Sequence, residues 1–147
     1  MKLNNWTKVL LVSICFASSI FGFLLKLPSI FRHVDKEIHS LFYFFAAALL
    51  NILFANNKIV RHVLIFIFLY LFGIAIEYAQ EYSNRLFHKR IHGRYDIEDV
   101  QSNLKGLILF TILWIIYNAI MLAYNKLKIK KLKILKNNYR KKLLPNN

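Results

Sequence analysis

Long apolar runs alternate with short polar segments along this chain. Residues 9–25, 41–50 and 63–76 contain no charged residue, and another apolar run follows residue 106. A helix that crosses a bilayer needs about 20 mostly apolar residues, so these runs must extend to their polar boundaries to span one. The pattern predicts helices over residues 7–26, 35–55, 59–81 and 96–124.

Polar and helix-breaking residues mark the connections between these helices. Pro28 follows the first run, and Asn56, Asn57 and Lys58 predict a tight turn between the second and third helices. Residues 82–95 form the longest loop, which we expect to be either a short interfacial helix or a re-entrant segment. No small-x-small cleavage pattern follows the first run, so we interpret it as a membrane span and not as a signal peptide.

The composition agrees with an all-α membrane protein. Hydrophobic residues make up 57% of the 147 residues, and charged residues make up only 19%, as is typical of small helical membrane proteins. The single cysteine, Cys15, excludes an internal disulfide. We therefore predict a four-helix transmembrane bundle over residues 5–125, followed by a basic juxtamembrane tail over residues 126–147.

The distribution of charge predicts the orientation. Four spans place both termini on one side, and that side would carry thirteen of the 21 Lys and Arg residues but none of the seven acidic residues. By the positive-inside rule both termini are cytoplasmic. The net charge of +14 comes largely from the tail beside the last apolar run. The expected partner is thus the anionic inner leaflet and not nucleic acid, with contacts through Lys126, Lys128, Lys130, Lys131 and Lys133.

Polar residues at helical spacing gather at the predicted outer ends of three helices. Residues three or four positions apart share one face of a helix, and in a bundle such polar faces turn away from lipid. We therefore expect these residues to share one pocket. The second helix contributes Asp35, Lys36 and His39, the third contributes Glu77, Gln80 and Glu81, and the fourth contributes Asp96, Asp99, Asn103 and Gly106.

The order and spacing of these residues resemble the VanZ-like family. The matching patterns are D-K-x-x-H at 35–39, E-x-x-Q at 77–80 and R-x-D-x-x-D-x-x-x-N-x-x-G at 94–106. The resemblance covers roughly residues 5–125 and implies a small multi-span protein of the bacterial cytoplasmic membrane. The family's namesake is linked to low-level resistance to the glycopeptide teicoplanin. The chain departs from the family in its very basic segment 82–93 and in Lys105.

Three hypotheses for function follow from these residues. The first is binding of a polar envelope component, such as a lipid-linked wall precursor or a glycopeptide, in which Lys36 and Arg94 meet phosphate or carboxylate. The second is an enzyme acting on a lipid-linked substrate, with Glu77 as general base and His39 as acid. The third is a small transporter. The predicted ligand-binding residues are Asp35, Lys36, His39, Glu77, Gln80, Arg94, Asp96, Asp99 and Asn103.

Each group of polar residues also has a purely structural interpretation. Asp96 and Asp99 suit the N-terminal end of any helix, and Glu77 could form an ion pair with Arg94 or Lys36. His88 and His92 have the spacing of a zinc pair, but Lys89 and Arg90 between them would repel a cation. We therefore predict no metal and no cofactor. A metal ion held by His39, Glu77 and Asp99 is an alternative that the sequence favours less.

Overall fold

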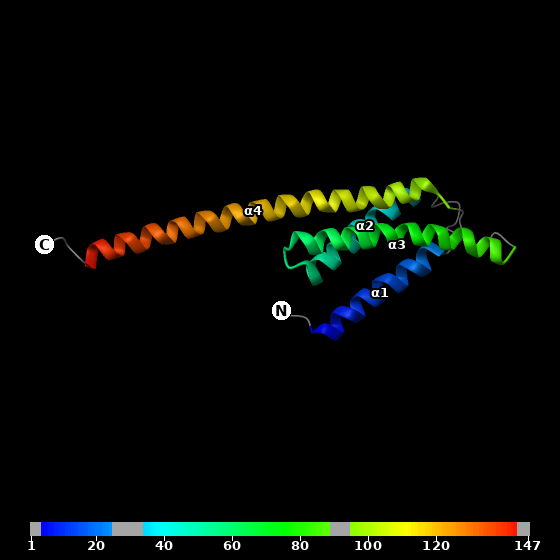
Figure 1. The fold of residues 1–147 in the computed structure, drawn as a ribbon, viewed down its shortest axis with the longest axis horizontal. Coiled ribbons are helices and arrows are strands. Elements are labelled where there is room, and N and C mark those ends of the chain that lie inside the picture. The colour runs from blue at the N-terminus through cyan, green and yellow to red at the C-terminus, as the bar shows by residue number, and fades with distance from the viewer. Residues whose placement is uncertain (1–3, 25–33, 89–94, 144–147) are drawn as a thin grey trace. The chain divides into compact units, whose positions relative to one another are not determined.

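A computed structural model of the chain describes residues 4–24, 34–88 and 95–143, with side chains described at 4–22, 34–88 and 95–140. The described residues form helices and turns without strands (Figure 1). The helices are α1 (Asn5–Leu24), α2 (Asp35–Leu50) with the short π-helical continuation η2 (Asn51–Ala55), α3 (Ile59–Leu86) and α4 (Ile97–Leu143). The chain divides into two units, Met1–Thr111 and Ile112–Asn147.

The structure confirms the prediction of an all-α fold with four helices of membrane-spanning length. Each of the four helices is long and apolar enough to cross a membrane. Helix α1 begins where the side chain of Asn4 accepts hydrogen bonds from the backbone N–H groups of Trp6 (2.6 Å) and Thr7 (3.3 Å). The predicted turn after the second helix is also present, because Asn56 and Asn57 both adopt a left-handed backbone that asparagine tolerates.

Two predicted helix ends were wrong. The third helix was expected to end at residue 81, but α3 continues to Leu86. The ion pair between Arg85 and Glu81, four residues apart, stabilises this added turn. The start of segment 82–95 is therefore ordinary helix and not a separate interfacial or re-entrant element. Residues 89–94, which include Arg94, Gly93 and His92, lie outside the described residues.

The fourth helix was expected to end near residue 124, but α4 continues to Leu143 and includes the basic tail. Residues 107–143 contain neither glycine nor proline and are rich in Leu, Ile and Lys, so nothing in the local sequence stops the helix. All the side chains from residue 119 to residue 140 are exposed. In its described part the tail is thus helical, and its side chains up to residue 140 are exposed.

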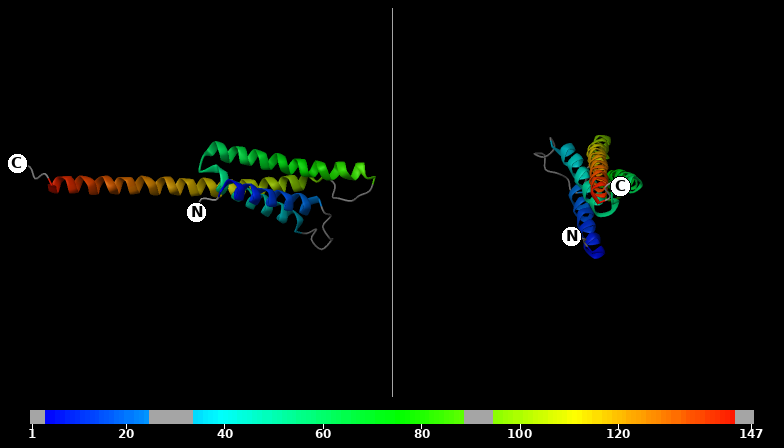
Figure 2. Two further views of the ribbon diagram at one scale, coloured as in Figure 1. Left: turned by 90° about the horizontal axis from the view of Figure 1, so that it is seen from below. Right: turned by 90° about the vertical axis from the view of Figure 1, so that its left-hand side faces the viewer.

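The core of the first unit lies where α2, α3 and the first turns of α4 meet. Its buried residues are Tyr43, Ala46, Ala47, Leu50, Leu69 and Leu107. Figure 2 shows the first turns of α4, in yellow-green, lying between α3 and α2. Gly106 permits this approach, because a Cβ atom there would collide with the backbone carbonyl of Ser40 on α2. The predicted role of Gly106 in close helix contact is confirmed.

Candidate functional site: a buried cluster of carboxylates around His39

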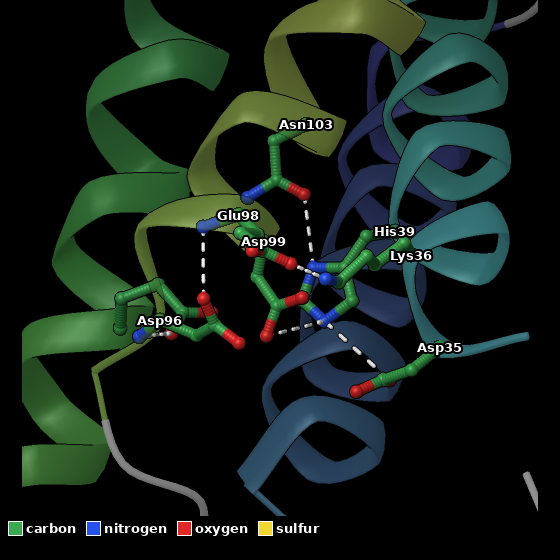
Figure 3. A network of polar contacts seen from close by, with 8 residues as sticks. Asp35, Lys36, His39, Asp96, Glu98, Asp99 and Asn103 are labelled. Atoms are coloured by element: carbon green, nitrogen blue, oxygen red, sulfur yellow. Dashed lines mark hydrogen bonds and ion pairs between the residues drawn. The ribbon is translucent and has the colours of Figure 1, made fainter. Parts of the chain in front are cut away.

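His39 is the centre of the polar cluster. It lies one turn into α2 and is buried, and its Nδ1 atom is 2.9 Å from Oδ1 of buried Asn103 on α4 (Figure 3). An amide oxygen only accepts hydrogen bonds, so Nδ1 of the imidazole carries the hydrogen. In the neutral imidazole this contact places the lone pair on Nε2 and fixes the orientation of the ring.

Two carboxylates flank the other ring nitrogen of His39. Its Nε2 atom lies 3.9 Å from Oδ1 of Asp35 and 4.0 Å from Oδ2 of Asp99, both beyond hydrogen-bond length. The Asp99 side chain is 13% exposed, whereas the Asp35 side chain is 31% exposed. The cluster is therefore accessible from the surface at Asp35 and is buried on the side of Asn103.

Glu77 is the most deeply buried ionisable residue of the cluster. It is 0% exposed, and its Oε2 atom accepts a hydrogen bond from the backbone N–H of Asp96 at 3.2 Å. Its Oε1 atom is also buried and has no hydrogen-bond partner among the described residues. Glu77 interacts electrostatically with Asp99, Asp96 and Asp35. A buried carboxylate among other carboxylates is costly unless something compensates its charge.

Lys36 does not enter the buried part of the cluster. Its ammonium group forms an ion pair with the carboxylate of Glu98, and the two side chains are 47% and 59% exposed (Figure 3). The alternative in which Lys36 pairs with Glu77 is therefore wrong. Both side chains of this pair are exposed, so the charge of Lys36 stays near the surface. Arg94, the other proposed partner of Glu77, lies outside the described residues.

Asp96 has a clear structural role. Its Oδ1 atom accepts a hydrogen bond of 2.8 Å from the backbone N–H of Glu98, which makes Asp96 the N-terminal cap of α4. Its own N–H group holds Glu77 in place. Gln80 is buried one turn after Glu77 on the same face of α3. The predicted site thus divides into an inner group and a peripheral group. The inner group is His39, Glu77, Gln80, Asp99 and Asn103, and the peripheral group is Asp35, Lys36 and Asp96.

Tyr43 and Gly73 also belong to the cluster, although they were not among the predicted site residues. Tyr43 is 1% exposed and interacts electrostatically with Glu77. A Cβ atom at Gly73 would lie 2.9 Å from both Oη of Tyr43 and Nδ2 of Asn103, so glycine makes room for these groups. The signal was present in the spacing, because Tyr43 follows His39 by four residues and Gly73 precedes Glu77 by four.

A second buried polar cluster lies at the opposite ends of α2 and α3 and was not predicted. Nδ1 of buried His62 is 2.8 Å from Oδ1 of Asn51, and Nε2 is 3.2 Å from the hydroxyl of Thr111. The amide of Asn51 also donates to the carbonyl of Ala47, next to the point where α2 widens into η2. No carboxylate takes part in these hydrogen bonds, which distinguishes this cluster from the one around His39.

Comparison with protein-family models, curated proteins and solved structures finds no match to the chain. The similarity of its motifs to the VanZ-like family therefore stays a prediction.

Proposed function

We propose that this chain is a multi-pass protein of the bacterial cytoplasmic membrane, of the VanZ-like type, that binds a polar component of the cell envelope. Four membrane-length helices support the membrane location. Large apolar side chains are exposed along all of them, including Leu64 and Phe68 on α3, as expected of surfaces that face lipid. The excess of Lys and Arg near the termini supports a cytoplasmic location for both ends and an outward-facing polar cluster.

The observation that carries the proposal is the buried carboxylate of Glu77. One of its oxygens has no partner among the described residues, although the side chain is wholly buried. Buried polar atoms are nearly always hydrogen-bonded, and ionisable groups within membrane helices mark functional sites by default. Replacing such a charge by an apolar residue often stabilises a protein. No described residue compensates Oε1 of Glu77, and binding of a ligand would explain why this position carries a glutamate.

The charge of the cluster determines what it binds. Among the described residues, two cations lie near the carboxylates of the cluster. They are His39 when it is protonated, between Asp35 and Asp99, and the partly exposed Lys36, whose ammonium pairs with Glu98. We infer that further positive charge comes from a ligand, either as a group of the envelope component or as a bound cation, because Oε1 of Glu77 is buried without a hydrogen-bond partner among the described residues. Direct contact of Lys36 with a phosphate or carboxylate of the ligand stays a prediction.

The test is the identity of the molecules that remain bound to the chain after mild extraction from bacterial membranes. Mass spectrometry of the bound lipids should find an envelope component on the wild-type protein that is lost from Glu77→Gln. Glu81→Gln is the matched control, because it changes the same group one turn away, where Glu81 pairs with Arg85 at the surface. Equal amounts of every lipid on all three proteins would contradict the proposal.

The orientation of His39 also favours a second candidate, an enzyme acting on a lipid-linked substrate. Its imidazole is fixed by Asn103, as a general acid or base requires, and the carboxylate of Glu77 is the candidate base. Turnover of lipid-linked substrates by the purified protein, abolished in Glu77→Gln and unchanged in Glu81→Gln, would establish chemistry. Binding without turnover would leave the first candidate.

A further inference from the structure

We propose that Asp35, His39 and Asp99 hold a divalent transition-metal ion, of the Zn²⁺ or Mn²⁺ class, with the carboxylate of Glu77 beside it. This inference rests on the proposed function in one respect, since the ion would supply the positive charge through which the cluster binds phosphate or carboxylate of an envelope component. The metal site itself depends only on contacts among the described residues.

The donor atoms have the spacing that a shared ion requires. One nitrogen of His39 and one oxygen each of Asp35 and Asp99 lie within 4.8 Å of one another. The two distances from Nε2 are 3.9 Å and 4.0 Å. Metal–ligand bonds of about 2.0–2.2 Å place donor atoms roughly 3.0–4.3 Å apart, depending on the coordination geometry. Small rotations of the carboxylates therefore suffice to bring all three atoms onto one ion.

The surroundings of His39 match those of histidine ligands in metal sites. Histidines that bind a metal through one nitrogen almost always donate the other N–H to an oxygen acceptor, which fixes the ring and raises its basicity. Here Asn103 is that acceptor, at 2.9 Å from Nδ1. A nitrogen donor with two carboxylates favours first-row transition metals, because Mg²⁺ and Ca²⁺ prefer oxygen ligands throughout.

Glu77 is the second, independent indication of a cation. Its Oε1 atom is buried and has no partner among the described residues, and its charge adds to those of Asp99 and Asp35 nearby. The ion pair of Lys36 is with Glu98 and lies at the surface. A dication at the cluster compensates several negative charges at once, and it can enter past the partly exposed side chain of Asp35.

The test is Zn²⁺ binding to the full-length chain in detergent, purified without a histidine tag and stripped with a chelator. Calorimetric titration should give one Zn²⁺ per wild-type chain. The affinity should fall at least tenfold in His39→Gln and in Asp99→Asn. Asn103→Ala, which removes only the acceptor behind His39, should weaken binding about 10–100-fold. Co²⁺ in place of Zn²⁺ should give the absorption bands of nitrogen and oxygen coordination.

His62→Gln is the matched control, because His62 is equally buried and is hydrogen-bonded to Asn51 outside any carboxylate cluster. It should bind Zn²⁺ as the wild type does. Binding that is lost in His88→Gln but kept in His39→Gln would place the ion elsewhere and overturn the proposal. Absence of Zn²⁺, Mn²⁺ and Co²⁺ binding by the folded wild-type chain would also overturn it, and would leave a protonated His39 between two carboxylates as a structural ion pair.

Different experimental results would refute the proposed metal site and the proposed function. One Zn²⁺ per chain with no envelope component bound would refute the proposed function and leave the metal site intact. An envelope component that stays bound to chelator-treated protein, together with no Zn²⁺ binding in the titration, would refute the metal site and leave the proposed function. Circular dichroism of every variant separates loss of binding from loss of folding.

Discussion

Replacing Glu77 by glutamine should stabilise the metal-free protein. Glutamine has nearly the same shape and can still accept the hydrogen bond from the backbone N–H of Asp96. It removes a negative charge that is wholly buried and that faces Asp99 and Asp35.

The magnitude follows from two opposing effects. The hydrogen bond from Asp96 becomes a neutral one, which costs about 1 kcal/mol. The uncompensated buried charge has a penalty of several kcal/mol. The free energy of unfolding should therefore rise by roughly 1–3 kcal/mol. Glu81→Gln is the control, since the exposed pair with Arg85 should contribute no more than about 0.5 kcal/mol.

The assay is unfolding in detergent, followed by circular dichroism, in the presence of a chelator. A loss of 2 kcal/mol or more in Glu77→Gln (roughly thirtyfold in the unfolding equilibrium) would refute the reasoning, because it would show that a cation of the protein itself already compensates Glu77. Adding Zn²⁺ at about 100 times its Kd should then stabilise the wild type by about 2.7 kcal/mol and the glutamine variant by less.

Three further predictions concern the orientation, the tail and the helix contacts. A cytoplasm-specific reporter should be active after Asn147 and silent within residues 83–92; activity at the loop would move the cluster to the cytoplasmic side. A peptide of residues 126–142 should bind anionic vesicles at low salt, with about 1 kcal/mol for each basic residue at the surface; a failure to bind would mean that its lysines only set the topology. Gly106→Ala should destabilise the fold by ~3 kcal/mol or more, because its Cβ would meet the backbone of Ser40. Gly22→Ala, with open space around the added Cβ, should be neutral or up to about 1 kcal/mol stabilising; equal effects at the two glycines would contradict the packing described.

The sequence predicted the helices because their signal is local. Apolar runs of membrane length and the Asn56–Asn57 turn depend only on neighbouring residues. Helix ends were less predictable, since a helix continues past the last apolar turn whenever its residues favour it. This explains the ion-paired extension of α3 to Leu86 and the helical tail up to Leu143.

The sequence also predicted which helix faces carry the cluster, because residues spaced by three or four share a face. The sequence could not predict how deeply each of these side chains is buried. Depth depends on how the helices rotate against one another, and contacts at Gly106 and Gly73 determine that rotation. The pairing of Lys36 with Glu98 and the cluster of His62 with Asn51 join residues from different helices. No spacing within one helix predicts such pairs.

The central claim is that the cluster around Glu77 and His39 binds something from outside the chain. Native mass spectrometry of the full-length protein, extracted from bacterial membranes in mild detergent, tests this most directly, since it detects a metal ion and an envelope component in the same spectrum. The account predicts bound species on the wild-type chain and on Glu81→Gln. On Glu77→Gln it predicts that the envelope component is missing and that the metal ion is held more weakly. The account would be contradicted if all three proteins, each shown to be folded, had only the mass of the chain without any bound species.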